Sequence, residues 1–478
     1  MRSAITAEQG AASSDLTIEH LNPPPAFDGG VCGAKLPHEE SEREQPQQPT
    51  ASGRGRLSLI ICDVGVRHWL VGLTAAVVVC GGAAACSERH STHATIDVDA
   101  AVALADQPVH VRVSGLRARE AVTVVSQAAD AQGQRWRGEA TFAADGDGVV
   151  DLDRSAPVSG SYGGADGMGL FWSMRPPTGD PDEAWFSPGY PDAAGAFEVR
   201  LTVTVAGQEL AARTLTRQWT ATGVTHRALT LGVDGAAGVL FLPSPGAARR
   251  PGVLLLGGSE GGVGRKYDAA LLASHGYPAL ALGYFDVPGL PETLRDIPLE
   301  YFATAARLLH AQPGADPGAV VVNGYSRGSE AALLLAESYP DLFRGAILYA
   351  PNDTVWSSFP GGGNAWTIGG VPVPQTAIPV THVAGPVLAI AGGEDRLWQS
   401  DAQAQRIMQH LDDAHVTAAH RALVYPDAGH GVGSFPYLAA GTSQASPGGV
   451  ARRMGGTREA DAAARCDSWP KVLAFLAA

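Results

Sequence analysis

The chain has 478 residues and a formal net charge of −14, with 34 Lys and Arg against 48 Asp and Glu. This length allows two or three domains with real cores. The acidic balance argues against nucleic acid as a partner, because there is no basic stripe to neutralise phosphates.

The first part of the chain combines a polar tail with the features of an export signal. Residues 1–66 are polar and aperiodic in stretches such as PHEESEREQPQQPTASGRGR, which is typical of disorder. Residues 67–86 hold a basic Arg67, an apolar run and then small residues up to Cys86. The tetrapeptide AAAC that ends at Cys86 resembles a bacterial lipobox, in which the cysteine is lipidated, with alanine where a larger aliphatic residue is usual.

Two explanations of this leader stay open, because the tail before Arg67 is atypical of a signal peptide. Either translation begins near Val64, or the apolar run is an uncleaved anchor that is short for a full membrane span. The leader predicts an exported lipoprotein that is anchored in the membrane through Cys86. If the leader is not functional, we expect a cytoplasmic protein.

The cysteine pattern excludes two classes of site. Four of the five cysteines precede residue 90, and the fifth is Cys466. We therefore expect no disulfide framework and interpret Cys466 as a packing residue on a helix. No Cys/His cluster has the spacing of zinc ligands, and we expect no metal and no cofactor.

Residues 94–222 predict an all-β domain of the immunoglobulin-like sandwich type. Apolar and polar residues alternate at period two in several runs between turn signals. These runs are QPVHVRVSGL (107–116), AVTVVSQAAD (121–130), GVVDLDR (148–154), AFEVRLTVTVAG (196–207) and QELAARTLTRQW (208–219). Such a series of short strands is typical of a β-sandwich. We expect Phe171 and Trp172 in its core and find no catalytic cluster there.

Residues 227–478 predict a mostly parallel sheet with helices on both faces. Apolar strand runs such as PGVLLLGG (251–258), AVVVNGYS (319–326) and PVLAIAGGED (386–395) alternate with amphipathic helical runs. Strand and helix in alternation indicate crossover connections between parallel strands. The strands are almost continuously apolar, which indicates that both faces of the sheet are covered.

Two serines fit the pattern G-x-S-x-G, and the context favours Ser326 as a nucleophile. In VVVNGYSRGSEAALLLAES (320–338), a strand runs directly into the serine and good helix formers follow at once. A nucleophile elbow needs this strand, turn and helix, with glycines beside the serine. Ser329 and Glu330 are interpreted as first-turn residues that favour the helix start.

Ser259 stands in a different context, in LLLGGSEGGVGRKYDAALLA (254–273), where more glycine follows and helical sequence resumes only near Tyr267. In an α/β-hydrolase this earlier loop supplies the second amide of the oxyanion hole. We therefore expect the backbone N–H groups of Ser259 or Glu260 to act together with the amide of Arg327.

A catalytic acid and a histidine should follow the nucleophile in that order, each just after a strand. Asp395 follows VLAIAGGE, and His430 follows ALVYPDAG. His430 would act as the base toward Ser326, and Asp395 would orient the imidazole. Asp353 and Asp427 remain alternatives for the acid.

With these motifs in place, the chain resembles the acyl-CoA thioesterase and bile acid-CoA:amino acid N-acyltransferase family from about residue 94 to the C-terminus. The similar segments in the first domain are residues 107–133 and GMGLFWSMRP. Those in the second are residues 290–315, IAGGEDRLWQSDAQAQ, YPDAGHGV and GGTREADAAARCDSWPKVLAFL. The resemblance implies an α/β-hydrolase behind a β-sandwich, with Ser326, Asp395 and His430 as the triad. The family's histidine region usually continues with residues like IEPPY, whereas here it reads GVGSFPY.

The resemblance also implies the reaction. The family's thioesterases use serine and its amino-acid conjugating transferase uses cysteine, so Ser326 points to hydrolysis of acyl-CoA or a related thioester or ester. Acyl transfer to an amine or alcohol, and an exported carboxylesterase, are the alternatives. We expect a monomer or small homo-oligomer and no nucleic-acid partner.

Overall fold

The computed structural model of the protein describes residues 90–445 and 451–478. Arg67 and the lipidation predicted at Cys86 lie outside these residues, so the leader stays a prediction from the sequence. Among the described helices, none combines the length and the apolar character that a membrane span requires.

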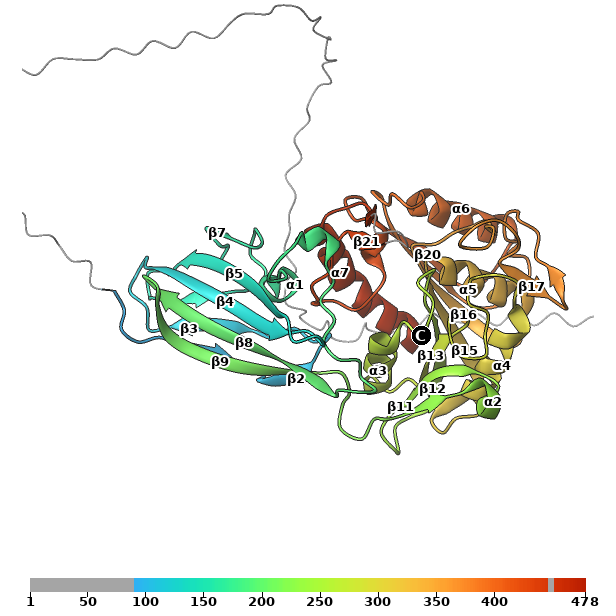
Figure 1. Ribbon diagram of the computed structural model, residues 1–478, viewed down its shortest axis with the longest axis horizontal. Coiled ribbons are helices and arrows are strands. Elements are labelled where there is room, and N and C mark those ends of the chain that lie inside the picture. The colour runs from blue at the N-terminus through green and yellow to red at the C-terminus, as the bar shows by residue number, and fades with distance from the viewer. Residues whose placement is uncertain (1–89, 446–450) are drawn as a thin grey trace, which may run out of the picture. The chain divides into compact units, whose positions relative to one another are not determined.

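Residues 95–218 form two sheets around one core (Figure 1). The larger sheet has the strand order β2-β9-β8-β4-β5-β7, and the smaller has the order β1-β3-β6. The strands are β1 (Thr95–Val98), β2 (Val102–Leu104), β3 (Val111–Ser114), β4 (Ala121–Ala129), β5 (Arg135–Ala143), β6 (Val150–Asp151), β7 (Ser159–Gly160), β8 (Ala196–Val205) and β9 (Gln208–Gln218). Because alternate residues of a strand face the same side, Val111 and Val113 of the smaller sheet point into the core. They share this core with Val122, Val124 and Leu201 of the larger sheet.

Strand β5 is a central strand that the sequence pattern did not predict. Its alternate residues are buried, but one of them is Gly138, which contributes no side chain to the pattern. A Cβ on Gly138 would lie 2.4 Å from the Leu170 carbonyl oxygen, so the short helix α1 (Gly169–Trp172) can pack here only against bare backbone. Phe171 and Trp172 of α1 are buried in the core, as expected.

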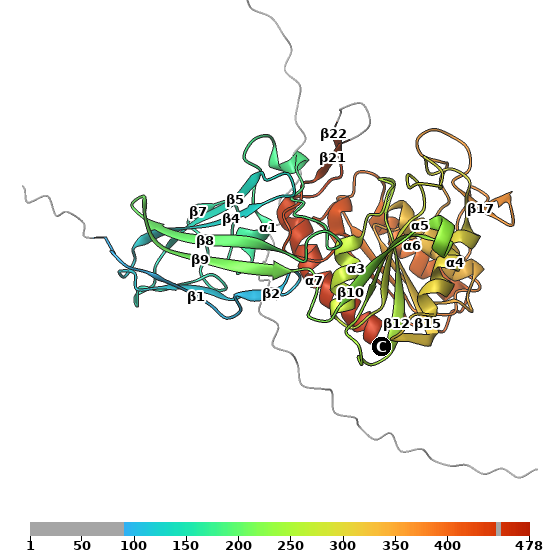
Figure 2. The same ribbon diagram turned by 60° about the horizontal axis from the view of Figure 1, so that its bottom comes forward.

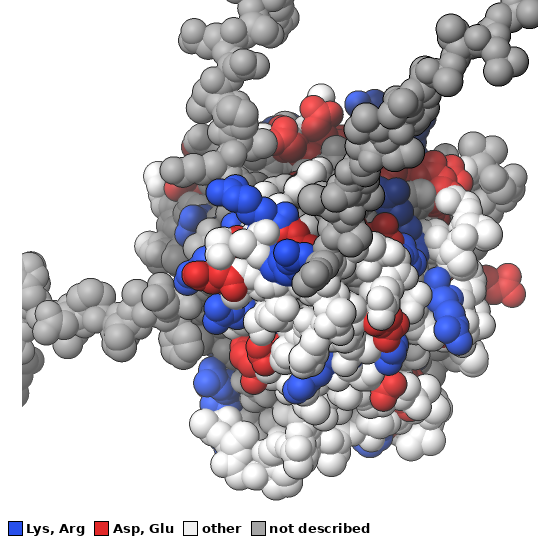
Figure 3. Space-filling view, turned by 90° about the vertical axis from the view of Figure 1, so that its left-hand side faces the viewer, with Lys and Arg blue, Asp and Glu red and all other residues white. Residues whose placement is uncertain are grey.

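Charges of both signs are interspersed on the face of the sandwich that Figure 3 presents. Arg200 of β8 and Glu209 of β9, for example, pair across the two strands at 3.0 Å, with about half of each side chain exposed. Exposed pairs of this kind contribute little to stability.

The second part of the chain is a sheet of eight strands in the order β10-β11-β13-β12-β15-β16-β19-β20. Its strands are β10 (Thr225–Leu229), β11 (Ala237–Leu242), β12 (Arg250–Leu256), β13 (Ala279–Gly283), β15 (Ala315–Tyr325), β16 (Phe343–Tyr349), β19 (Val387–Gly392) and β20 (His420–Tyr425). The pairs β10–β11 and β11–β13 are antiparallel, and all other neighbours are parallel. With β12 between β13 and β15, this is the sheet of an α/β-hydrolase, and the predicted fold class is confirmed.

Helices cover both faces of this sheet, as Figure 2 shows. One core holds residues of α4 (Leu299–His310), α5 (Arg327–Ser338) and α6 (Ser400–Asp413). The other core holds residues of α3 (Lys266–Ser274) and α7 (Arg458–Ala477). Burial on both sides explains why the strands are apolar without alternation. The shorter elements are α2 (Leu231–Asp234), β14 (Ile297–Pro298), β17 (Trp366–Ile368), β18 (Val371–Pro372), β21 (Ser443–Ala445) and β22 (Ala451–Arg453).

The sandwich packs against the face that α3 and α7 cover. Asp106 pairs with His275 of α3 at 2.6 Å and accepts a hydrogen bond from Trp469 Nε1 of α7 at 2.8 Å. Trp219 packs against Tyr267, with ring centroids 4.3 Å apart and the ring planes tilted by 42°. Buried contacts of both polar and aromatic kinds therefore join the two parts.

Cys466 also lies on α7, with its Sγ 3.6 Å from the Tyr437 hydroxyl. Cys466 thus lies on a helix, as expected, and it is also disulfide-bonded, which its sequence context did not indicate.

Candidate active site

Ser326 lies at a sharp turn between the end of β15 and the start of α5. Its backbone has φ 55° and ψ −123°, a conformation that L-residues avoid unless the surroundings impose it. A Cβ on Gly328 would lie 2.2 Å from the Gly257 carbonyl oxygen, and a Cβ on Gly324 would lie 2.1 Å from the Gly328 carbonyl oxygen. Glycine is therefore needed on both sides, and the turn holds the serine hydroxyl at the carboxyl edge of the sheet.

The structure brings Ser326, His430 and Asp395 together from three separate loops. His430 Nε2 lies 2.9 Å from Ser326 Oγ, and His430 Nδ1 lies 2.8 Å from Asp395 Oδ2. The side chains of His430 and Asp395 are only 2% and 0% exposed. A carboxylate beside Nδ1 holds the proton there, which leaves Nε2 free to accept the serine proton.

The two alternative acids lie elsewhere. Asp353 is buried and bonded by Arg406 of α6, whose Nη2 lies 3.2 Å from its Oδ1. Asp427 is exposed on the turn after β20. Only Asp395 of the three candidates bonds the histidine.

Several contacts hold His430 in place, and sequence reasoning missed most of them. The imidazole is flanked by the rings of Tyr325 at 5.2 Å and Trp398 at 5.0 Å, centroid to centroid. The His430 backbone N–H donates to the Met454 carbonyl at 3.0 Å. On the other side, Asp461 Oδ1 accepts from the Gly429 N–H at 2.7 Å. The motif YPDAGH gave the position of the histidine, but no local signal points to partners this distant along the chain.

The glycine-rich loop after β12 lies directly beside the elbow. Tyr284 donates its hydroxyl proton to the carbonyl oxygens of Gly257 at 2.7 Å and Gly258 at 2.9 Å. Because a trans peptide is planar with its C=O and N–H opposed, the Ser259 N–H points away from Tyr284. A Cβ on Gly258 would lie 2.9 Å from Ser326 Cβ, which shows how closely this loop approaches the nucleophile.

The contacts of the glycine-rich loop reduce the number of backbone N–H groups that could bind an oxyanion. The Gly258 N–H is already bonded to Glu260 Oε1 at 2.9 Å, so it is not available to a substrate. Ser259 and Glu260 line the same cavity as Ser326 and His430. Arg327 is the first residue of α5, where backbone N–H groups have no partner within the helix. Ser259 and Glu260 thus lie at the cavity and Arg327 directly follows Ser326, and the role of their N–H groups stays a prediction.

A cavity of about 390 Å³ opens beside Ser326 and His430. Much of its wall is aromatic, and part of that wall comes from the sandwich domain. The aromatic residues from both parts are Trp185, Phe186, Tyr190, Tyr267, Tyr325 and Phe435. Trp185 Nε1 donates to the Ser443 carbonyl at 2.9 Å, and the Phe186 N–H donates to the Ala439 carbonyl at 3.0 Å. These bonds fix the sandwich segment against the catalytic part, so both domains shape the space that a substrate enters.

The charged residues of the cavity wall are Glu260, Arg265, Asp268 and Arg465. Arg265 pairs with Asp268 at 2.9 Å and donates to the Gly433 carbonyl at 2.7 Å. Burial raises the pKa of Asp268, opposed by the charge of Arg265. The described residues contain no group of three His, Cys, Asp or Glu arranged to hold a metal ion.

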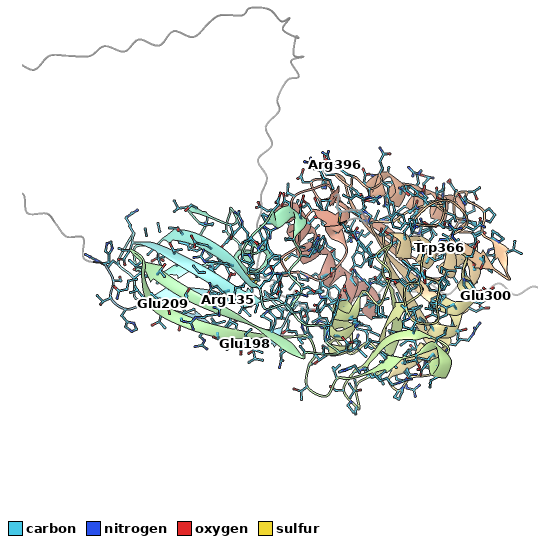
Figure 4. The ribbon with its side chains drawn as sticks, viewed as in Figure 1. Arg135, Glu198, Glu209, Glu300, Trp366 and Arg396 are labelled. Carbon is cyan, nitrogen blue, oxygen red and sulfur yellow. The ribbon has the colours of Figure 1, made fainter. Side chains whose placement is uncertain are left out.

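Glu330 is fully buried beneath the elbow, whereas its place in the sequence predicts only a first-turn residue that favours the helix start. Its carboxylate lies 3.0 Å from Arg327 Nε and accepts from Trp366 Nε1 at 2.6 Å (Trp366 is labelled in Figure 4). It also accepts from Asn352 Nδ2 and the Trp356 N–H, each at 3.1 Å. One carboxylate thus ties the residue after the nucleophile to the loop that follows β16.

Burial raises the pKa of Glu330 to about 7, against the opposing charge of Arg327 and the hydrogen bond from Trp366. The pKa in the unfolded chain is about 4.5, so between pH 4.5 and 7 the folded protein holds a proton that the unfolded chain has released. The free energy of unfolding therefore falls as pH rises through this range. We expect Glu330→Gln to remove this contribution, so that wild-type Tm declines relative to the variant from pH 4.5 to 7. Thermal melts at several pH values measure this, with the exposed Glu292→Gln as control; parallel wild-type and Glu330→Gln curves would contradict it.

Comparisons with known proteins place the chain in a family. Residues 106–230 match the model described as Acyl-CoA thioester hydrolase/BAAT N-terminal region, and residues 369–478 match BAAT / Acyl-CoA thioester hydrolase C terminal. Acyl-coenzyme A thioesterase 6 of Mus musculus is 30% identical over 399 residues, which cover 77% of this chain and 93% of the relative. The chain belongs to this acyl-CoA thioester hydrolase and N-acyltransferase family. The resemblance inferred from the sequence is therefore confirmed.

Relatives named as thioesterases and relatives named as N-acyltransferases are both similar to the chain. Acyl-coenzyme A amino acid N-acyltransferase 1 of Mus musculus is 30% identical over 408 residues, covering 78% of this chain and 94% of the relative. Acyl-coenzyme A thioesterase 6 of Homo sapiens is 28% identical over 403 residues, covering 77% and 93%. Among solved structures, a dienelactone hydrolase from Anabaena variabilis matches 44% of this chain and 88% of its own, with 19% identity and a TM-score of 0.29. The sequence identities to the two kinds of relative are alike, so they do not distinguish hydrolysis from acyl transfer. The chemistry of the site has to distinguish them.

Proposed function

We propose that this protein is a serine thioesterase that hydrolyses acyl-CoA or a related acyl thioester to the free acid and the thiol. The observation that carries the proposal is the connected line from Ser326 through His430 to Asp395, with distances of 2.9 and 2.8 Å, at the wall of an aromatic cavity. Family membership supports the acyl thioester as the substrate class.

The geometry provides for an acyl-enzyme mechanism. His430 Nε2 removes the Ser326 proton while Oγ bonds to the thioester carbonyl carbon, and the negative charge on the carbonyl oxygen would be stabilised by the N–H groups of Arg327 and of Ser259 or Glu260. When the C–S bond breaks, His430 returns the proton to the departing thiolate. A water molecule then loses its proton to His430 and attacks the acyl-Ser326 ester, and the proton passes back to Oγ as the acid leaves. Asp395 stabilises the imidazolium in both halves.

Product analysis tests the proposal against acyl transfer. Purified protein is incubated with an acyl-CoA, and the CoA thiol and the acyl products are measured with and without glycine or taurine. We expect equal amounts of CoA and free acid, unchanged by the added amine. Formation of an N-acyl amino acid would establish the transferase alternative. Rapid cleavage of p-nitrophenyl esters with no cleavage of any thioester would establish a carboxylesterase instead. Membrane anchoring through Cys86 and the oligomeric state stay predictions from the sequence.

A further inference from the structure

The loop that carries His430 has little regular structure of its own. It follows β20 and contains the 3₁₀ turn η2 (His430–Val432), whose hydrogen-bond geometry is poorer than that of an α-helix. Yet His430 has to stay near Ser326 Oγ, at 2.9 Å, and near Asp395 Oδ2, at 2.8 Å, while its imidazole gains and loses a proton. Contacts from other elements therefore have to fix the position of this histidine loop.

Helix α7 contacts the histidine loop through two buried charged residues that are four positions apart. Asp461 Oδ1 accepts a hydrogen bond from the Gly429 N–H, and Arg465 Nε donates to the Gly431 carbonyl, both at 2.7 Å. A Cβ on Gly431 would collide with Asp461 Oδ2 and lie 3.2 Å from Arg465 Nη2, so the two charged groups meet at this glycine. Burial raises the pKa of Asp461 to about 6, and the charge of Arg465 is the largest effect that opposes this rise. Helix α7 thus holds the residues on both sides of His430.

The start of α3 contacts the other end of the histidine loop in the same way. Arg265 donates from Nη1 to the Gly433 carbonyl at 2.7 Å and from Nη2 to Asp268 Oδ1 at 2.9 Å. The same carboxylate oxygen accepts from the Ser434 hydroxyl at 3.4 Å. The side chains of Arg265 and Asp268 are only 8% and 5% exposed, so this second pair is also buried. Because Arg265 directly follows the glycine-rich loop of residues 257–264, it also joins that loop to the histidine loop.

The burial of these two acid–arginine pairs indicates a role beyond stability. Removal of charges from water costs free energy, and apolar side chains of similar volume often stabilise a fold as well or better. Apolar side chains, however, offer no hydrogen bonds to backbone groups. The contacts of the two pairs fall at residues 429, 431, 433 and 434, and both members of each pair take part. The charged groups therefore add a series of directional bonds along one short loop.

We propose, on the basis of the serine chemistry proposed above, that the two acid–arginine pairs form a clamp that positions the catalytic histidine. The clamp consists of Asp461 and Arg465 on α7 and of Asp268 and Arg265 at the start of α3. These positioning residues act on the histidine loop and so keep the imidazole in line with the nucleophile and the catalytic acid. Loss of one contact should displace the imidazole without removing a reacting group, and a displacement of about 1 Å can lower a rate about 100-fold.

Asp461→Ala and Arg265→Met test one member of each pair. Each variant removes a contact to the histidine loop and is expected to lower kcat for an acyl-CoA by about 10- to 100-fold, while KM changes by less than about threefold. Asp461→Asn keeps an oxygen that can accept from the Gly429 N–H and should restore kcat to within about threefold of the wild type. Asp467→Ala is the matched control on α7, because the Asp467 side chain is half exposed, and it should leave kcat within about twofold.

Labelling of Ser326 by a fluorophosphonate distinguishes this proposal from the thioesterase function. The probe reacts with an activated serine and needs no thioester, so its rate should fall in Asp461→Ala and Arg265→Met by the same factor as kcat. If the wild type is labelled but cleaves no thioester, the thioesterase function fails, and the labelling rates alone decide on the clamp.

Three results would overturn the clamp. Unchanged kcat and labelling in variants whose Tm is lowered would show that the pairs only stabilise the fold. A loss that is expressed in KM alone would assign Arg265 to substrate binding. Asp461→Asn as slow as Asp461→Ala would show that the hydrogen bond to Gly429 does not position the histidine. Tm values show which variants are folded, and Arg265→Met decides if Asp461→Ala is not.

Discussion

Replacement of Ser326 by alanine is expected to lower kcat for thioester hydrolysis by about 10⁵- to 10⁶-fold, the range for loss of a serine nucleophile that acts as a unit with its histidine. The substitution removes only the hydroxyl group, whose oxygen Oγ lies 2.9 Å from His430 Nε2. Without it no acyl-enzyme can form, and the remaining rate would come from binding and from the oxyanion donors alone. Release of CoA from an acyl-CoA substrate, followed with a thiol reagent, measures the effect.

Two further serines are matched comparisons for this variant. Ser338→Ala makes the same change at the other end of α5, on a partly exposed residue, and should leave kcat within about twofold, as for a surface change. Ser259→Ala tests the second G-x-S-x-G motif, where backbone rather than side chain is proposed to act, and should cost less than about tenfold. If Ser259→Ala abolished activity and Ser326→Ala retained it, the assignment of the nucleophile would be reversed.

Asp395→Asn is expected to lower kcat by about 10⁴-fold with little change in fold, the effect reported for this substitution in a serine–histidine–aspartate triad. Asp395 Oδ2 lies 2.8 Å from His430 Nδ1, and its Oδ1 is held by the Leu397 N–H at 2.9 Å. In Asp395→Asn the side-chain amide faces the imidazole either with an N–H group or with an oxygen that lacks the negative charge of the carboxylate. The imidazole then loses both its preferred tautomer and the stabilisation of its protonated form.

Steady-state kinetics on an acyl-CoA, with Tm as the measure of folding, checks this expectation. Asp427→Asn is the matched control, because Asp427 precedes His430 by three residues in the same loop yet is exposed. That variant should hydrolyse the substrate at close to the wild-type rate. A large loss in Asp427→Asn together with a small loss in Asp395→Asn would show that a different carboxylate serves the histidine.

The sequence was informative where a local pattern determines the structure. The run from Val320 through Ser326 to Ser338 combines a strand, a turn and a helix without a gap, and this is how the structure folds. The order of acid and histidine behind their strands placed Asp395 and His430, because parallel strands end at one edge of the sheet. Period-two alternation identified most strands of the sandwich for the same local reason.

Features that depend on distant contacts could not be read in this way. Glu330 has the sequence context of an exposed first-turn acid, and only the fold brings Trp366 and Asn352 to it. Arg465 lies on α7, a helix whose sequence mixes polar and apolar residues. It is buried because α7 packs beside the active-site cavity. Strand β5 was missed because Gly138, which its packing requires, interrupts the alternation.

The segment of the sandwich that contains Trp185, Phe186 and Tyr190 forms one wall of the cavity, while the reacting groups all belong to the other domain. Evolution can therefore change the acyl groups this protein accepts by altering a loop that takes no part in bond making or breaking. The same separation is useful in engineering, since a library confined to residues 185–190 would vary selectivity on an intact reaction centre.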